Sequence, residues 1–196
     1  MDHSSSPIPR RKRISDEQLL DAACAEFARA GYEPARMDAI AKTAKTTKAT
    51  LYARFGTKEE LFKATLTRES DLLRERLLHA YSLDPTIQLP ERLDAYVDAY
   101  FEFGAQRPDG FRLLFMDDGG SAAAVQSTVR EEITTRIAAL IAAELGQRQP
   151  TNGDRVLAAL IIGATHYGAG AAAANGIPIA HAATITKHFL LAALSN

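Results

Sequence analysis

The stretch "TTKATLYARFGTKEELF", residues 46–62, decides the fold. It predicts a short helix that Gly56 ends, because glycine readily adopts the backbone conformation that closes a helix. Thr57 and Glu60 then form a capping box, which opens a second, longer helix. A short helix buries little apolar surface, and one this rich in Thr, Lys and Tyr is typical of a helix that is presented to a partner.

The residues before this stretch complete a unit of three helices. Ser15 and Gln18 form a first capping box, before a helix that Gly31 ends. "RMDAIAKTA" (36–44) predicts a short second helix with its apolar residues on one face. Two short helices joined by a tight turn match a helix-turn-helix, whose last helix enters the major groove of DNA. The alternative is an ordinary connecting helix with solvated polar side chains.

The side chains of the third helix suit contact with DNA. Threonine hydroxyls and a lysine ammonium reach base edges or phosphates, and alanine leaves room for a thymine methyl group. We expect Leu51 and Phe55 to face inward and Tyr52 to lie outside, where its phenol can bond a phosphate. Lys58 adds a positive charge at the start of the next helix. The first two turns of the third helix supply Thr47, Lys48, Ala49 and Thr50.

Charge is divided unevenly along the 196-residue chain, whose formal net charge is −1. Residues 1–63 carry 12 Lys and Arg against 9 Asp and Glu, and the rest of the chain carries 11 against 15. A basic end on an acidic body indicates a module that faces a polyanion. The basic segment 1–13, "MDHSSSPIPRRKR", is either an arm that reaches phosphates or a minor groove, or a disordered solubilising tail.

Helical periodicity continues to the end of the chain, and no alternating strand pattern interrupts it. The sequence therefore predicts an all-α fold with about nine helices. Beyond the first three, we expect helices from Thr57 to about Tyr81, from Pro90 to just before Pro108, in "FRLLFMDD" (111–118), from about Ala122 to Leu145, over 153–174 and over 178–194.

The segment "MDAIAKTAKTTKATLYARFGTKEELF" (37–62) resembles the DNA-binding signature of the TetR family of bacterial repressors. The family pattern is carried by Leu51, Tyr52, Phe55, Lys58 and Leu61.

The chain departs from the family pattern at four positions. Lys45 replaces the usual glycine of the turn, and a left-handed lysine costs about 1 kcal/mol relative to glycine. Thr46 replaces an aliphatic residue, and Ala49 stands where glycine is common. Arg36 takes the place of a serine or threonine, and both it and Lys45 can add a phosphate contact. The predicted DNA-binding residues are Arg36, Lys45, Thr46, Thr47, Lys48, Ala49, Thr50, Tyr52 and Lys58.

The resemblance implies three parts: a flexible basic arm (1–13), a helix-turn-helix DNA-binding domain (14–62), and a helical effector-binding and dimerisation domain (63–196). It also implies a homodimer that binds a palindromic operator and is released by a small-molecule effector. Repression is favoured over activation only by this resemblance.

The last two helices are the expected dimer interface. Residues 153–174 are apolar around most of the helix, and such a helix must be covered on more than one side. The alternative is a helix in the core of a monomer. The predicted interface residues are Val156, Leu160, Gly163, Tyr167, Ile185 and Phe189.

A dense aromatic set in the middle of the chain is the expected effector pocket, by the same resemblance. Its size indicates an apolar effector, and His166 and Tyr167 are candidates for the few polar contacts such a pocket needs. The alternative is that the aromatic residues are simply core. The predicted pocket residues are Tyr96, Tyr100, Phe103, Phe115, Met116, His166 and Tyr167.

Other classes of protein find little support. "GAGAAA" (168–173) matches a dinucleotide-binding pattern formally but follows no strand, and the histidines lack metal-ligand spacing. We expect no enzyme, cofactor or metal. The alternative function is a helical dimerising interaction protein without specific DNA binding.

Two features bear on location. The single cysteine, Cys24, reads as a small buried hydrophobic residue, as in proteins of a reducing cytoplasm. The longest apolar run, "VLAALIIGA" (156–164), is shorter than the roughly 18 residues of a membrane span. We expect a cytoplasmic protein that does not bind membranes.

Overall fold

The computed structural model describes residues 14–81, 87–114, 121–147 and 149–194. Within these ranges the chain forms helices and no strand, as the sequence predicts. The helices are α1 (Asp16–Ala30), α2 (Met37–Thr43), α3 (Lys48–Phe55), α4 (Lys58–Tyr81), α5 (Leu89–Gln106), α6 (Pro108–Leu114), α7 (Ser121–Glu144), α8 (Asn152–Ala174) and α9 (Ile179–Leu194).

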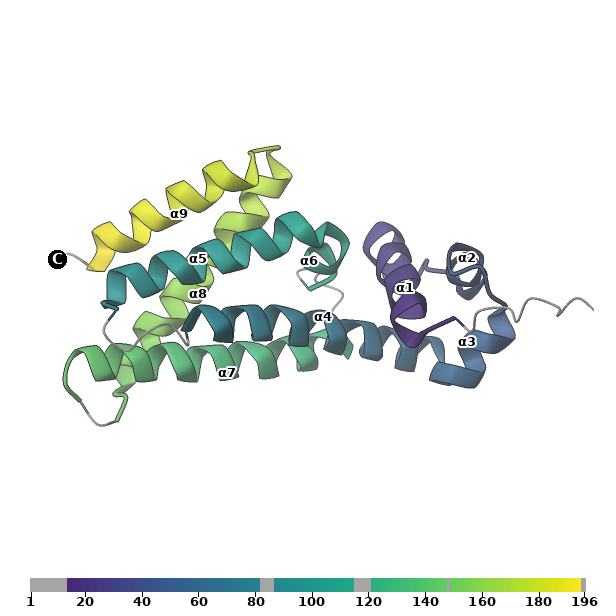
Figure 1. Cartoon of the computed structure of the whole chain (residues 1–196), viewed down its shortest axis with the longest axis horizontal. Coiled ribbons are helices and arrows are strands. Elements are labelled where there is room, and N and C mark those ends of the chain that lie inside the picture. The colour runs from purple at the N-terminus through teal and green to yellow at the C-terminus, as the bar shows by residue number, and fades with distance from the viewer. Residues whose placement is uncertain (1–13, 82–86, 115–120, 148, 195–196) are drawn as a thin grey trace, which may run out of the picture.

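The helices divide into two groups that share α4 (Figure 1). Helices α1–α3 form one end of the molecule, and α4 runs from that end into a larger body made with α5–α9. The first half of α4 packs on α1, and α5 and α7 pack along it farther on. The predicted domain boundary at 62/63 thus falls inside one continuous helix. The two groups of helices are therefore joined by α4 itself and not by a linker.

The helix starts predicted from capping boxes are confirmed. The amide of Gln18 donates to Ser15 Oγ at 3.3 Å, and the amide of Glu60 donates to Thr57 Oγ1 at 3.1 Å. The Glu60 carboxylate accepts from the Thr57 amide in return, at 2.7 Å. Glycine is favoured at position 56 because its φ of 76° is strained for other residues, and a Cβ atom there would also displace the Glu60 carboxylate.

Helix α6 begins earlier than the sequence predicted. We expected a helix over 111–118, but the helix starts at Pro108 and its described part ends at Leu114. Proline has the backbone angle that a first helical residue needs, and it lacks only a hydrogen that would be unpaired there. The carbonyl of Arg107 accepts from the Phe111 amide at 2.8 Å, which closes the first turn. Residues 115–118 lie outside the described residues.

One apolar core runs through both groups of helices. Phe27 of α1 packs edge-on against Phe62 of α4, with ring centroids 4.9 Å apart. The same buried cluster continues through Leu66 to Tyr96 of α5 and Ile137 of α7. Because each such side chain contributes roughly 1.5–3 kcal/mol when it is buried, the cluster holds the two groups together.

A buried charge lies where the two groups meet. Glu69 of α4 is fully buried, and the guanidinium of Arg107, between α5 and α6, donates to both of its carboxylate oxygens at 2.7 and 2.6 Å. Arg68 donates to the same carboxylate and also pairs with Asp21 of α1 at 2.9 Å. Gly110 of α6 approaches so closely that a Cβ atom on it would lie 2.1 Å from Glu69 Oε2. We call these five residues the Glu69 junction.

The arginines keep the junction ionised. Burial alone would raise the pKa of Glu69, but the hydrogen bonds from Arg107 and Arg68 outweigh it and hold that pKa below its ordinary value. A group with a lowered folded pKa stabilises the fold above its ordinary pKa, and that contribution disappears as the pH falls through the folded value.

Glu69→Ala should lower the free energy of unfolding by about 3 kcal/mol, because Arg68 and Arg107 lose the buried carboxylate that they share and keep only exposed carboxylates as partners. Urea unfolding at pH 7 measures the loss. Below a pH of about 4, the difference from the unmodified chain should shrink as the carboxylate is protonated.

Glu102→Ala is the matched control. Glu102 also pairs across α4 and α5, with Arg76 at 3.7 Å, but its side chain is 66% exposed. It should cost less than about 1 kcal/mol. Equal losses of unfolding free energy in the two variants would show that the buried ion pair of Glu69 stabilises the fold no more than an exposed one.

Candidate functional site

The turn between α2 and α3 has a left-handed lysine. Lys45 has a φ of 53°, as its place in the turn predicts, and no other described non-glycine residue has a positive φ. Its amide donates to the Lys42 carbonyl at 3.1 Å, and the next amide, of Thr46, donates to the Ala41 carbonyl at 2.9 Å. These two bonds are those of a Schellman motif, which satisfies the last carbonyls of α2. The turn therefore forms despite the lysine.

Helix α3 is capped by Thr47 and presents a polar face. Thr47 Oγ1 accepts from the Thr50 amide at 3.2 Å, and the two hydroxyls lie 2.9 Å apart. Lys48 and Ala49 are exposed, and Tyr52 is 44% exposed, whereas Leu51 is fully buried. The helix thus turns one face into the core and the predicted DNA-contacting side chains toward solvent.

Two further predicted residues flank α3. The side chain of Arg36 is exposed and makes no capping bond, so it is available to a ligand. Lys58 is half-buried, donates to the Glu33 carbonyl at 2.9 Å and lies 4.9 Å from the centre of the Tyr32 ring. Lys58 thus ties the start of α4 to the loop between α1 and α2.

Arg54 is a residue of this surface that the sequence reasoning missed. It pairs with Asp16, and it donates to the Ile14 carbonyl at 3.0 Å, which fixes the end of α3 to the start of α1. A lone arginine near a helix end carries no signal of such a distant contact.

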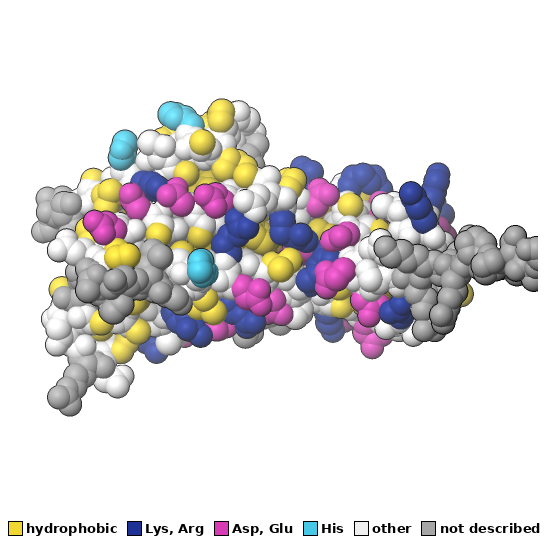
Figure 2. All heavy atoms as spheres, in the orientation of Figure 1, with side chains coloured by type: hydrophobic (Ala, Val, Ile, Leu, Met, Phe, Trp, Pro, Cys, Tyr) yellow, Lys and Arg dark blue, Asp and Glu magenta, His cyan; other side chains and the backbone are white. Residues whose placement is uncertain are grey.

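The helix-turn-helix end also carries unneutralised cations. Lys42 and Lys45 are exposed and take part in no ion pair among the described residues, and Lys48 pairs only with Asp38, at 3.3 Å. Figure 2 shows several Lys and Arg side chains projecting from the α1–α3 end of the molecule. Positive charges beside an exposed polar helix suit a polyanionic partner.

An exposed apolar face runs along α8 and α9. The predicted interface residues lie on it, and Tyr167 is 77% exposed. Contiguous exposed apolar surface is uncommon in monomers and marks interaction sites. The large exposed apolar side chains of the two helices are Val156, Leu160, Tyr167, Ile179, Ile185 and Phe189.

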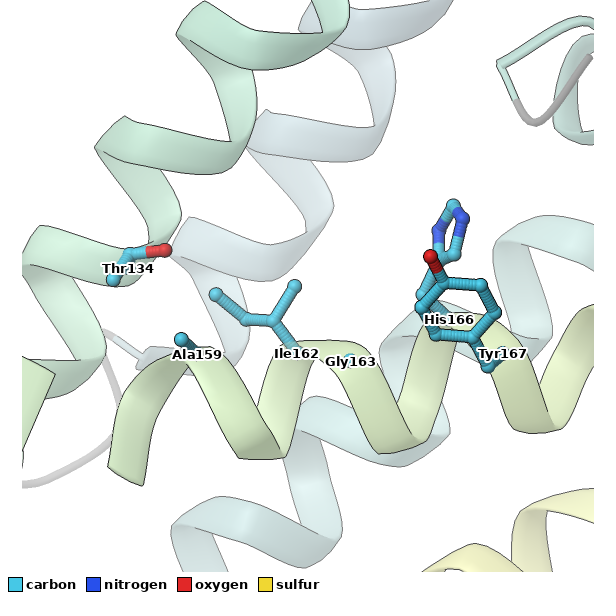
Figure 3. Close-up of a pocket in the computed structure, with 6 residues that line it drawn as sticks. All are labelled: Thr134, Ala159, Ile162, Gly163, His166 and Tyr167. Atoms are coloured by element: carbon cyan, nitrogen blue, oxygen red, sulfur yellow. The ribbon is translucent and has the colours of Figure 1, made fainter. Parts of the chain in front are cut away.

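A small pocket of about 200 Å³ adjoins this face (Figure 3). Thr134 reaches it from α7, and the other lining residues, His166 and Tyr167 among them, come from α8. His166 Nδ1 is hydrogen-bonded to the Tyr100 hydroxyl at 3.3 Å. Of the predicted effector residues, His166 and Tyr167 therefore line this small pocket.

The other predicted effector residues lie elsewhere. Tyr96, Tyr100 and Phe103 are buried in the core, and burial raises the pKa of the Tyr96 hydroxyl. Phe115 and Met116 fall outside the described residues.

A larger groove, of about 500 Å³, lies between α5, α6, α8 and α9. Its size is in the range of small-molecule sites. Phe101 and Phe111 form apolar walls, with Gly104 beneath the Phe111 ring, and Asp109 and Arg112 are exposed at its edge. Neither Phe101 nor Phe111 is among the predicted pocket residues, and the groove depends on packing between helices that only the structure shows.

Helices α1–α3 define a helix-turn-helix protein of the DNA-binding class. The sequence profile described as "Bacterial regulatory proteins, tetR family" matches residues 19–65.

Two transcriptional regulators are similar in sequence to part of the chain. The "HTH-type transcriptional activator FasR" of Mycolicibacterium smegmatis is 40% identical over 111 residues, 57% of this chain and 49% of that protein. The "HTH-type transcriptional repressor SCO4008" of Streptomyces coelicolor is 31% identical over 137 residues, 67% of this chain and 65% of that protein. The chain thus spans about half to two thirds of the length of these relatives.

Two solved structures share the fold. A TetR-like transcriptional regulator from Rhodococcus sp. RHA1 has a TM-score of 0.74 and 27% identity, covering 97% of this chain and all of that one. FadR of Bacillus subtilis, in complex with stearoyl-CoA, has a TM-score of 0.75 and 16% identity, covering 90% and 97%.

The helix-turn-helix end of this chain is thus a DNA-binding region of the TetR type, and the relatives and solved structures that resemble the chain are transcriptional regulators. Across the parts that the structure describes, none of the helices combines the length and apolar content needed to cross a bilayer.

Lys45→Gly should raise the free energy of unfolding by about 1 kcal/mol, because glycine adopts the left-handed conformation without steric cost. Thermal or urea unfolding measures it. Lys45→Ala removes the same charge but keeps a Cβ atom in the strained conformation, so it should bring no such gain. A gain of equal size in both variants would trace the effect to the charge.

Proposed function

We propose that this chain is a cytoplasmic, sequence-specific DNA-binding regulator that inserts α3 into the major groove. The observation that carries the proposal is the division of α3 into a buried face at Leu51 and an exposed face of Thr, Lys, Ala and Tyr. The match of residues 19–65 to the TetR-family profile supports the same function. Phosphate contacts give such a protein its affinity, and base contacts give it selectivity.

The predicted residues divide into these two roles. Lys48, Ala49 and Thr50, at the start of α3, face the bases, where a lysine can contact guanine and an alanine the thymine methyl group. Because the Thr47 hydroxyl already caps the helix, it contributes mainly to orientation. Tyr52 lies further along the exposed face and contacts phosphate.

Cations around α3 supply the remaining phosphate contacts. Arg36 and Lys45 are exposed on either side of α2, and Thr46 lies between that turn and α3. Lys58 keeps its bond to the Glu33 carbonyl and offers its remaining donors.

The active form is a homodimer joined through α8 and α9. A second copy would cover the exposed apolar side chains of Leu160, Tyr167 and Phe189, which otherwise face water. Gly163 lies on the same face, and nothing lies within 4 Å of where its Cβ would be, so a partner helix can approach closely. Two copies of α3 about 34 Å apart then match the half-sites of a palindromic operator.

A small apolar effector releases the dimer from DNA. The groove of about 500 Å³ offers apolar walls at Phe101 and Phe111, with Asp109 and Arg112 exposed at its edge, which suit a largely apolar molecule. The acyl chain of stearoyl-CoA, the ligand in the solved structure of FadR of Bacillus subtilis, is an apolar group of this kind. A ligand that changes operator affinity 5- to 150-fold supplies about 1–3 kcal/mol of coupling.

Repression is the proposed outcome, because release by an effector then switches a gene on. A second candidate is activation, favoured by the 40% identity to a relative named as an activator. A reporter gene behind the operator separates the two: its output falls when the regulator is supplied if the chain represses, and rises if it activates.

DNA binding is tested by fluorescence anisotropy with DNA from immediately upstream of the chain's own gene, against scrambled DNA, across a salt series. We expect tight, selective binding with a steep salt slope. Lys48→Ala should reduce the selectivity, and Lys45→Ala should weaken binding to all DNA and lower the slope by about one.

A lysine outside the helix-turn-helix serves as a control for this test. Lys187→Ala removes one lysine of the larger body, where it pairs with Asp98 at 2.6 Å, and should leave DNA affinity unchanged. Equal binding to both DNAs, unaffected by Tyr52→Phe with Lys58→Ala, would instead support the dimerising interaction protein without specific DNA binding.

Dimerisation is tested by replacing one exposed apolar residue. Leu160→Asp should convert the dimer to monomer, since a carboxylate at a packed interface loses its hydration without gaining a partner. Light scattering after gel filtration measures the mass. Lys63→Asp on α4 introduces the same carboxylate away from this face, with one more unit of charge change, and should leave the dimer intact. An unchanged mass for Leu160→Asp would place the interface elsewhere.

A further inference from the structure

The corner between α5 and α6 contacts two features at once. On one side, Pro108 and Asp109 line the groove of about 500 Å³. On the other, Arg107 and Gly110 contact the carboxylate of Glu69. Four consecutive residues therefore lie between the groove and the Glu69 junction.

The junction continues into the DNA-binding end. Arg68, the neighbour of Glu69 on α4, donates to the Glu17 carbonyl at 3.1 Å and pairs with Asp21 at 2.9 Å, both on α1. Arg107 also lies 3.7 Å from Asp21. One buried carboxylate thus connects α4, α6 and α1, and Figure 1 shows α6 beside α1 where the two groups of helices meet.

The contact leaves little room for gradual movement. The space that a side chain would need at Gly110 is occupied by the Glu69 carboxylate, so α6 cannot move toward α4 without pushing it. A movement away would stretch the paired bonds of 2.6 and 2.7 Å from Arg107. Closely packed contacts that are held by two hydrogen bonds tend to switch between distinct arrangements rather than deform smoothly.

We propose that Glu69 is a positioning residue that transmits occupation of the α5–α6–α8–α9 groove by an apolar ligand to helix α1. An occupant between Phe111 and α8 displaces the corner, and Arg107 and Gly110 carry that displacement to the carboxylate. Arg68 passes it to α1, which supports the helix-turn-helix. This inference rests on the proposed function for its biological meaning, but its structural content can be tested without DNA.

The groove can be filled without knowing the natural ligand. Ile179 lines it and is 39% exposed, so Ile179→Cys offers an anchoring point for N-phenylmaleimide, whose phenyl ring occupies apolar space. The native Cys24 should stay unmodified, because it is buried and burial raises its pKa to about 12. Labelled and unlabelled samples of one variant then differ in the phenyl group at the groove. Because Ile179 also lies on the exposed apolar face of α8 and α9, light scattering checks that both samples have the same mass.

Hydrogen exchange of the α1 amides is the direct measurement. Labelling should change the exchange rates across Asp16–Ala30 at least threefold. In the Glu69→Gln background, which keeps the shape of the side chain but removes its charge, that response should disappear. Gly110→Ala keeps every charge but crowds the carboxylate, so it should also alter the response of α1 to labelling. This variant replaces Glu69→Gln in the experiment if Glu69→Gln folds poorly.

Glu102→Gln is the matched control. It makes the same substitution in an exposed ion pair between α5 and α4, away from the junction. Its response to labelling should equal that of the unmodified background. Two results would overturn the inference: no change in α1 on labelling, or an equal change in the Glu69→Gln and Glu102→Gln backgrounds.

DNA affinity, measured on the same samples, separates this inference from the proposed function. If α1 responds through Glu69 and operator affinity changes 5- to 150-fold, both stand. If α1 responds through Glu69 but the chain binds no DNA selectively, the junction works as inferred and the proposed function fails. If operator affinity changes on labelling while Glu69→Gln has no effect on that change, the function stands and the inference fails.

Discussion

The ionised carboxylate of Glu69 is the contact on which the relation between the two ends of the molecule depends. A buried carboxylate is costly unless charged partners surround it, and here both partners are arginines, one beside it on α4 and one between α5 and α6. Apolar packing can hold helices together in several registers, whereas a pair of directed bonds selects one. The junction therefore contributes more to the position of α1 relative to α6 than to cohesion.

Helix α4 connects the Glu69 junction to both ends of the molecule. The helix begins at a capping box beside α3, passes the junction near its middle, and ends against α5 and α7. Since α4 is one continuous helix, the junction and the capping box beside α3 lie on the same element. The helix-turn-helix is thus supported at the start of α4 and, through Arg68, along α1.

The turn before α3 shows a different balance. A glycine at Lys45 would relieve left-handed strain, yet the chain keeps a lysine there beside the exposed Lys42. Strained residues persist where the surroundings hold them, and they are often found at functional sites. Two hydrogen bonds to the end of α2 hold this one. The strain places a cation at the edge of the helix-turn-helix surface.

Local signals account for what could be predicted from the sequence. Capping boxes need only residues three apart, so the starts of α1 and α4 were predicted. The left-handed lysine followed from the family resemblance, in which Lys45 replaces a glycine. The start of α6 was missed because the apolar pattern was followed and Pro108 was read only as a stop. Glu69 and Arg107 are 38 positions apart, and no local pattern links them. The large groove was missed for the same reason.

Helix α8 serves more than one surface, and this separates the two pockets. Its buried face, at Ala158, Ile161 and Thr165, packs into the core, while its outer face carries Leu160 and Tyr167. Tyr167 belongs both to that outer face and to the small pocket. If a second copy covers the outer face, an occupant of the small pocket lies against the partner and acts on the pairing of subunits. An occupant of the large groove lies against the α5–α6 corner and acts on the Glu69 junction. The two pockets differ, then, in the contact through which a ligand would be sensed.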